Sequence, residues 1–150
     1  MTQALADAES RSEKLGMSSV SLVCTVHEEK GAATVSGLLE ILKRLQPEVI
    51  FAEMPPEAVE DYFTTCARSN LESNAIRRYV DGHEVRIIPV DLPTPDEVFF
   101  RNNKYLFERI EQQSAEYCRQ IDLHSAYVSE YGFAYLNSGL LLIPLTPPLA

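Results

Sequence analysis

Three short apolar segments of this 150-residue chain predict β-strands, and an ionisable residue follows each of them. The segments and the residues that follow them are Ser19–Val26 with His27, Val49–Ala52 with Glu53, and Val85–Val90 with Asp91. Helical patterns separate the segments, and strands that alternate with helices are typical of a parallel α/β sheet. The carboxyl ends of parallel strands meet at one edge of the sheet, where ligands usually bind. The sequence therefore predicts a small parallel α/β fold with flanking helices and a candidate site at that edge.

The segments between the predicted strands have the periodicity of amphipathic helices. Over residues 32–45 apolar side chains recur three and four positions apart, which predicts a helix with one buried face. The dipeptide Gln46-Pro47 is expected to end this helix. Further helices are expected from near Pro56, because proline suits a first helical turn, and over residues 71–80. The first helix and the strands on either side of it form a β-α-β unit.

A long last helix is predicted from Thr94 to about Gly132. Thr94 and Glu97 have the spacing of a capping box, and glycine is common just after a helix end. Apolar residues recur along this helix at steps of seven and four: they are Phe99, Leu106, Ile110, Tyr117, Ile121 and Val128. We interpret this stripe as a packing surface.

The length of the chain fits one ordinary domain. Residues 1–18 are polar and lack the apolar segment of a secretory signal, so we expect a flexible or helical N-terminal arm. Residues 19–132 form the predicted α/β domain. Residues 133–150 are expected to be an irregular tail, because their apolar tract has no period and contains Pro144. That tract is far shorter than the ~20 residues of a membrane span.

The charge and the cysteines argue against several classes of partner and compartment. The chain has 13 Lys and Arg residues against 22 Asp and Glu residues, a formal net charge of −9, and no basic cluster longer than Arg77-Arg78. Such a chain lacks the electrostatic surface that binds a phosphate backbone, so we expect no nucleic-acid partner. Cys24, Cys66 and Cys118 fit no zinc or redox spacing and indicate a reducing compartment. We therefore expect a soluble, cytoplasmic protein.

The residues that follow the predicted strands have functional and structural interpretations. His27 can ligate a metal or exchange protons near neutral pH, although a lone histidine is more often a hydrogen-bonded structural group. Glu53 follows an apolar run, where its carboxylate needs a cation or a donor unless the strand simply ends in solvent. Asp91 supports the same site or, more readily, is a turn residue before Leu92 and Pro93. The sequence leaves these alternatives open.

One imidazole and two carboxylates form a ligand set suited to Mn²⁺, Fe²⁺, Co²⁺ or Zn²⁺. Glu28, directly after His27, is a candidate general base, but an acidic residue near a helix start is also expected for dipole reasons. His83 and His124 are expected at the surface, away from this edge. The chain has no Gly-rich phosphate loop and no Gly-x-Ser-x-Gly motif, so nucleotide binding and serine-hydrolase chemistry lack their usual signals.

Two motifs flank the first predicted helix, Cys24-Thr25-Val26-His27 before it and Pro47-Glu48-Val49-Ile50-Phe51-Ala52-Glu53 after it. They resemble the TraB/PrgY/GumN and Tiki superfamily, which is related to erythromycin-esterase and ChaN-like proteins. In that superfamily one strand ends in Gly-x-x-His and the next reads Pro-Asp-Val-Ile-x-x-Glu. The strand that ends at Asp91 is also similar, so the resemblance covers about residues 20–91.

The resemblance implies that His27 and Glu53 are active-site residues and metal ligands. The activity that it implies is a peptidase-like hydrolysis that depends on a divalent metal, with Mn²⁺, Co²⁺ or Zn²⁺ and a peptide or small-molecule substrate. Glu53 or Glu28 would accept a proton from water, and Asp91 would support the site.

The chain departs from the superfamily pattern at two points. Cys24 stands where the superfamily has the glycine of Gly-x-x-His, and the second Gly-x-x-His of the superfamily's later half does not occur. We therefore expect an incomplete version of a larger domain, either a truncated form or a degenerate relative. The alternative function is a non-catalytic interaction module that keeps the fold and uses the long last helix to bind a second copy or another protein.

Overall fold

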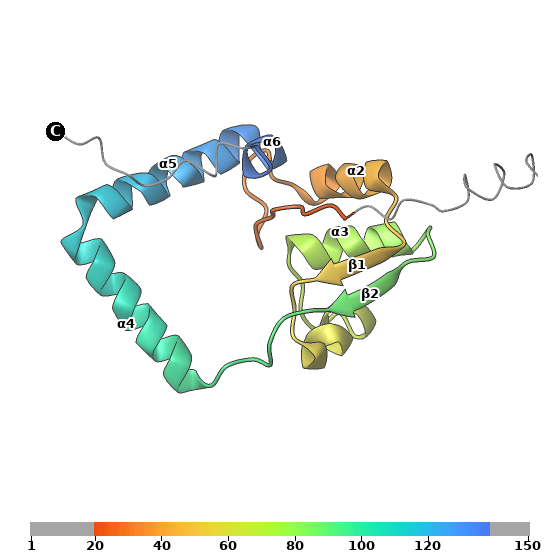
Figure 1. The fold of residues 1–150 in the computed structure, drawn as a ribbon, viewed down its shortest axis with the longest axis horizontal. Coiled ribbons are helices and arrows are strands. Elements are labelled where there is room, and N and C mark those ends of the chain that lie inside the picture. The colour runs from red at the N-terminus through yellow and green to blue at the C-terminus, as the bar shows by residue number, and fades with distance from the viewer. Residues whose placement is uncertain (1–19, 139–150) are drawn as a thin grey trace, which may run out of the picture.

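Two parallel strands form the sheet in the part of the chain that the computed structural model describes, residues 20–138. β1 (Val49–Ala52) pairs with β2 (Arg86–Pro89), and Ile50 lies opposite Ile87. Both strands lie inside segments that the apolar pattern predicts as strands. This confirms the predicted class, a small parallel α/β fold with flanking helices (Figure 1).

Residues 20–26 form no strand, so the prediction of a strand over Ser19–Val26 is wrong for them. The side-chain amide of Asn137 binds their backbone instead. The N–H of Cys24 donates to Asn137 Oδ1 at 2.8 Å, and Asn137 Nδ2 donates to the Cys24 carbonyl at 3.2 Å. One side chain thus satisfies groups that a neighbouring strand would otherwise pair, and an apolar run alone does not distinguish the two outcomes.

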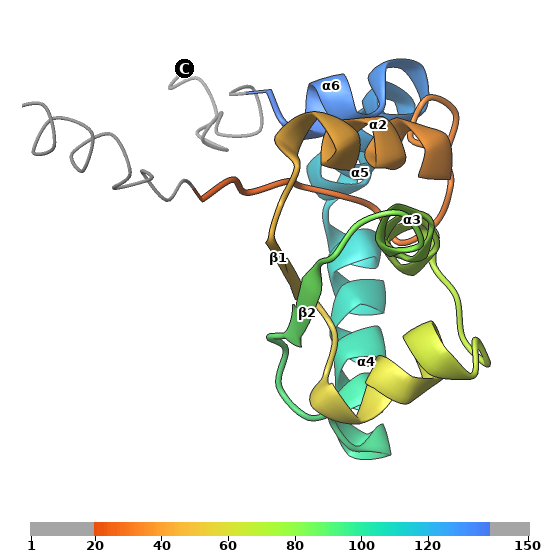
Figure 2. The ribbon, with the colours of Figure 1, turned by 90° about the vertical axis from the view of Figure 1, so that its right-hand side faces the viewer.

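α2 (Val35–Leu45) begins three residues later than predicted, because residues 30–33 form a tight turn closed by two backbone hydrogen bonds. The side chain of Thr34 caps α2 by accepting the N–H of Gly37 at 3.1 Å. Glu29 accepts the first helical N–H at 2.7 Å. Figure 2 shows α2 and α3 on the same side of the two-stranded sheet.

α3 (Leu71–Val80) has the bounds that the sequence predicts. The helix expected from near Pro56 begins there, but as a 3₁₀ turn, η1 (Pro56–Ala58), followed by a π-helical turn, η2 (Glu60–Thr64). The core lies among α2, α3 and the sheet, and side chains from residues 128–136 pack against it. Its larger buried side chains are Leu38, Leu42, Met54, Leu71, Ile76, Tyr79, Val128, Phe133 and Leu136.

The long C-terminal helix is present, and Ser114 divides it into α4 (Glu97–Gln113) and α5 (Ala115–Tyr131). Ser114 has an extended backbone with φ −132° and ψ 94°, and its hydroxyl accepts the N–H of Tyr117 at 3.1 Å to cap α5. α5 ends before Gly132, as predicted. Figure 1 shows α4 and α5 at a wide angle to each other, with α4 apart from the sheet.

Asp96, and not Thr94, caps α4, so the predicted capping box is wrong. Asp96 Oδ1 accepts the N–H of Phe99 at 2.8 Å, as an aspartate at an N-cap commonly does. The N–H of Thr94 donates instead to Glu57 Oε1 at 2.8 Å. This backbone hydrogen bond lowers the pKa of the Glu57 carboxyl and ties the segment before α4 to η1.

The C-terminal end of α5 attaches to the turn before α2. Val128 is buried there, and the carbonyl of Ser129 accepts the N–H of Ala32 at 2.8 Å. Gly31 and Gly132 both have positive φ and bring the two backbones close together: a Cβ on Gly31 would lie 2.1 Å from the Ser129 carbonyl oxygen. Only glycine fits such an approach without displacement.

α6 (Phe133–Leu136) lies within the segment that we expected to be irregular, and both Phe133 and Leu136 are buried. The predicted N-terminal arm, residues 1–18, and the remainder of the predicted tail, residues 139–150, lie outside the described residues. Between residues 20 and 138, no helix is long and apolar enough to cross a bilayer.

Candidate functional site

An open surface pocket of about 510 Å³ contains both residues that we named as metal ligands. His27 and Glu53 line it together with Leu22, Val23, Cys24, Thr25 and Val26. Glu53 is the first residue after β1, and its side chain is exposed. His27 and Glu53 thus line the same pocket, but His27 follows an irregular segment rather than a strand.

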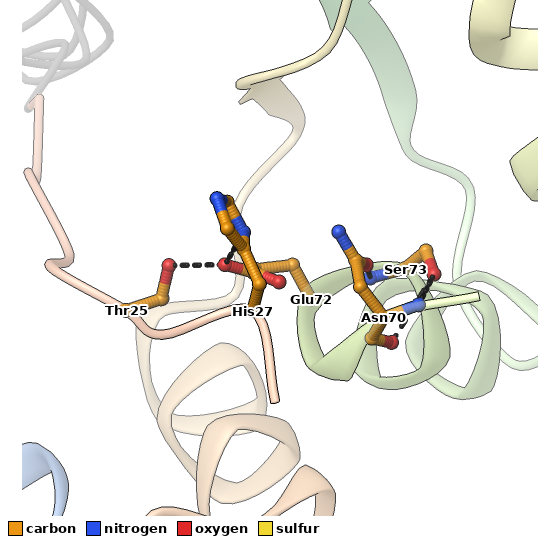
Figure 3. Close-up of polar contacts among 5 residues, drawn as sticks. All are labelled: Thr25, His27, Asn70, Glu72 and Ser73. Carbon is orange, nitrogen blue, oxygen red and sulfur yellow. Dashed lines mark hydrogen bonds and ion pairs between the residues drawn. The ribbon is translucent and has the colours of Figure 1, made fainter. Parts of the chain in front are cut away.

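The ring of His27 is held by a residue that the sequence did not single out, Glu72 (Figure 3). Its Nδ1 lies 3.1 Å from Oε1 of Glu72, and the hydroxyl of Thr25 donates to the same oxygen at 2.7 Å. The Glu72 side chain is 18 % exposed and that of His27 is 71 % exposed. A carboxylate that accepts the Nδ1 proton orients the ring and leaves Nε2 available as a base or a ligand.

The N-terminus of α3 holds Glu72 in position. Asn70 and Ser73 form a reciprocal capping box, with Ser73 N donating to Asn70 Oδ1 at 2.8 Å and Asn70 N donating to Ser73 Oγ at 3.0 Å. The N–H of Leu71 donates to the His27 carbonyl at 2.7 Å, which fixes the backbone of His27 to this helix end. The helix dipole also favours a carboxylate in the first turn.

Glu72 Oε2 is buried and has no hydrogen-bond partner within residues 20–138. An unpaired buried carboxylate oxygen costs free energy, so this acidic group is an unusual feature of the site. The signal in the sequence was an acidic residue two positions after an Asn cap, but the helix dipole alone explains an acidic residue there. The contact with His27, 45 residues away, is visible only in the folded chain.

Glu28 and Asp91 do not line this pocket. Glu28 is exposed in the bend after His27. Asp91 Oδ1 accepts the N–H of Leu92 at 2.7 Å, and its own N–H donates to the Met54 carbonyl at 3.2 Å. Asp91 therefore acts as a turn residue that joins the ends of the two strands.

The other two histidines make structural contacts away from the pocket. His83 stacks on Tyr79 with ring centroids 4.1 Å apart, and its Nδ1 lies 2.8 Å from the Tyr79 carbonyl oxygen. His124 Nδ1 lies 3.1 Å from the hydroxyl of Tyr135. Neither lines the pocket of His27.

Among residues 20–138, no group of three or more His, Cys, Asp or Glu side chains is placed to hold a metal ion. His27 and Glu53 supply two candidate ligands, whereas catalytic zinc sites have three protein ligands. The described residues therefore do not complete the Mn²⁺, Co²⁺ or Zn²⁺ site that the resemblance implies. We assign no metal-bound step to this pocket.

No protein family, curated protein or solved structure matches this chain significantly. The resemblance to the TraB and Tiki superfamily stays a prediction that rests on His27, Glu53 and the residues around them.

The α4–α5 arm, residues 97–131, presents a second candidate site. α4 has no buried residue, and Val128 is the one buried residue of α5. The large apolar side chains that α4 exposes are Val98, Phe99, Phe100, Tyr105, Leu106 and Phe107, each 47–61 % accessible. Those of α5 are Ile121, Leu123, Tyr127 and Tyr131.

The apolar stripe, which we interpret as a packing surface, is therefore not packed against the body for most of its length. Of its residues only Val128 is buried, because α4 projects from the body instead of lying on it (Figure 1). Monomeric domains rarely expose contiguous apolar patches of more than a few hundred Å², and larger ones mark interaction sites. The exposed apolar side chains of α4 and α5 together make the arm a candidate interaction surface.

Charged side chains avoid the apolar face of α4. At about 100° per residue, one face of the helix carries Phe99, Asn103, Leu106 and Ile110. The opposite face carries Glu97, Arg101, Lys104 and Glu108. On that face Lys104 pairs with Glu108 at 3.9 Å. We call the residues Phe99, Asn103, Leu106 and Ile110 the α4 face.

Proposed function

We propose that this chain is a protein-interaction module and that the α4 face is its docking surface for an amphipathic helix. The observation that supports this is a 17-residue helix with no buried residue and half-exposed aromatic side chains. An apolar stripe with residues three, four and seven positions apart is the pattern by which one helix recognises another. The α/β body then serves to hold the arm, through Val128 and the turn at Gly31.

The size of the surface indicates a small interface of the transient class. An aromatic side chain buries about 150–250 Å² when covered. The half-exposed Phe99 and Leu106 of the α4 face, with the flanking Phe100 and Phe107, therefore offer roughly 400 Å². A standard interface takes about 800 Å² from each partner. We therefore expect a transient interaction with a Kd in the micromolar range, unless α5 adds further area.

A designed helix tests this docking surface. The probe is a fluorescent peptide of leucine and lysine, about 18 residues or roughly five helical turns long, with one apolar face. We expect saturable binding in fluorescence anisotropy. The double variant Phe99→Asp/Leu106→Asp is expected to weaken it at least about tenfold, because its carboxylates would be buried against leucine.

The matched control is Arg101→Gln/Lys104→Gln on the opposite face of α4. Each double variant lowers the formal net charge by two, from −9 to −11, and so attracts a lysine-rich peptide more strongly. Weaker binding by the first variant therefore cannot come from charge. Equal binding by both variants would show that the peptide recognises only the acidic surface, and it would contradict the proposal.

A second candidate function is hydrolysis assisted by a divalent metal, in a domain related to the TraB and Tiki superfamily. Its specific support is that His27 and Glu53 line one pocket while Glu72 orients the His27 ring. In such a hydrolase Glu72 would be a positioning residue. A third metal ligand, besides His27 and Glu53, would come from outside the described residues or from the substrate.

Calorimetric titration with Mn²⁺, Co²⁺ and Zn²⁺ tests this second candidate. We expect saturable binding by the unaltered chain and its loss in His27→Ala/Glu53→Ala, because both candidate ligands are then removed. Glu28→Ala, at an exposed residue outside the pocket, is expected to keep the binding. Equal heats for all three proteins would rule out a metal site formed by His27 and Glu53.

A further inference from the structure

We infer that the helix bound by the α4 face is α4 of a second copy of this chain, docked antiparallel; the inference rests on the proposed docking function of this face. The spacing of the stripe residues is symmetric along the helix. Phe99 and Ile110 are equally far from the midpoint between Lys104 and Tyr105, and Asn103 and Leu106 lie closer in on either side. A two-fold axis through this midpoint therefore maps the face onto itself, as an interface between two identical copies requires.

The outer residues of the face then meet apolar partners, and its centre combines a polar with an apolar side chain. Phe99 packs against the partner's Ile110, and Asn103 lies beside the partner's Leu106. Antiparallel helices alternate their stripe residues in this way, with knobs from one helix between residues of the other. The one polar residue of the stripe, Asn103, lies near its centre, where a polar group restricts the register at some cost in stability.

The flanks of the stripe favour the antiparallel arrangement over the parallel one. In the antiparallel pair Phe100 lies beside the partner's Phe107, and the amide of Asn102 lies beside the partner's Arg109. A parallel pair would instead place Phe107 beside the partner's Asn102. Aromatic pairs contribute more than the burial of their area alone, and an amide oxygen accepts well from a guanidinium.

Electrostatics permit this association although both copies are acidic. The chain has a formal net charge of −9, which opposes self-association in general. The glutamates of α4, at positions 97, 108 and 111, lie away from the face, and Glu108 is paired with Lys104 at 3.9 Å. Two copies can therefore bring their α4 faces together without placing carboxylates opposite each other.

Charge complementation in the full chain tests the orientation. Two single variants are made, Asn103→Asp and Leu106→Lys, and the weight-average mass of each is followed by sedimentation from about 1 to 200 µM. We expect wild type to self-associate in this range. Each variant alone should self-associate at least about tenfold more weakly, because it places a charge against an uncharged side chain.

An equimolar mixture of the two variants should recover association to within about threefold of wild type. Only the antiparallel arrangement puts Asp at position 103 beside Lys at position 106 of the other copy. Both positions are on the solvent-exposed arm, so far-UV circular dichroism should show unchanged helix content in each variant.

Two results would overturn the inference in different ways. Wild type that stays monomeric to about 200 µM while it binds the leucine–lysine peptide would exclude a second copy and leave the docking function standing. Wild type that self-associates, with a mixture that does not recover, would exclude the antiparallel orientation. Failure of wild type both to self-associate and to bind the peptide would reject the docking function as well.

Discussion

Replacing Gly31 with alanine is expected to destabilise the folded chain by about 2–4 kcal/mol, because a left-handed backbone and a steric clash act together. The φ of Gly31 is +54°, and a Cβ there would lie 2.1 Å from the backbone oxygen of Ser129. To make room, α5 must move away, which breaks the hydrogen bond from Ala32 N–H to that same oxygen. Urea unfolding followed by circular dichroism measures the effect.

Gly82→Ala is the matched control, because no atom lies within 4 Å of a Cβ at that position. There we expect no loss of stability and a gain of up to about 1 kcal/mol from a stiffer unfolded chain. Gly132→Ala should resemble Gly31→Ala, since its Cβ would lie 2.6 Å from the Ala32 carbonyl carbon. Equal unfolding midpoints for the alanine variants at 31 and 82 would contradict the close packing of α5 on this turn.

Replacing Val128 with aspartate is expected to lower the free energy of unfolding by about 3–5 kcal/mol, because it buries a carboxylate without a partner. Val128 is 1 % exposed and is the one residue that α5 contributes to the core. A loss of this size is a large part of the stability of an ordinary domain. The measurement is again urea unfolding, with the midpoint and the slope compared with those of wild type.

Ile121→Asp provides a comparison on the same helix and the same apolar stripe. Ile121 lies seven residues before Val128 but is 49 % exposed, so we expect a change of no more than about 0.5 kcal/mol. Similar losses for both variants would mean that the whole stripe packs inside the molecule. A large loss for Val128→Asp alone would mean that α5 packs on the core only near its C-terminal end.

The sequence predicted those parts of the fold that depend on local pattern. The bounds of α3 and the end of α5 before Gly132 follow from periodicity and from residues adjacent to each helix end. β1 and β2 follow from short apolar runs with a helix pattern between them. Glu53 lies at the carboxyl end of β1, the edge of a sheet where ligands usually bind.

The sequence failed where one pattern is compatible with two environments. Residues 20–26 have the composition of a strand, but their backbone meets the Asn137 side chain. The helical pattern on both sides of Ser114 predicts one continuous helix. In the structure the backbone of Ser114 is extended and divides α4 from α5. In the sequence Glu72 is simply an acidic residue in the first turn of a helix. Only the folded chain, which brings α3 beside the segment around His27, places the two side chains together.

By itself the sequence determined the parallel α/β class, the bounds of α3, the ends of α2 and α5, the apolar stripe and the carboxyl-edge position of Glu53. Each of these depends on hydrogen bonds or periodicity within a few residues along the chain. Only the tertiary structure determined which part of the stripe is buried, where Asn137 binds and what holds His27. These features depend on contacts between segments far apart in sequence, and periodicity indicates that a face is apolar without indicating what covers it.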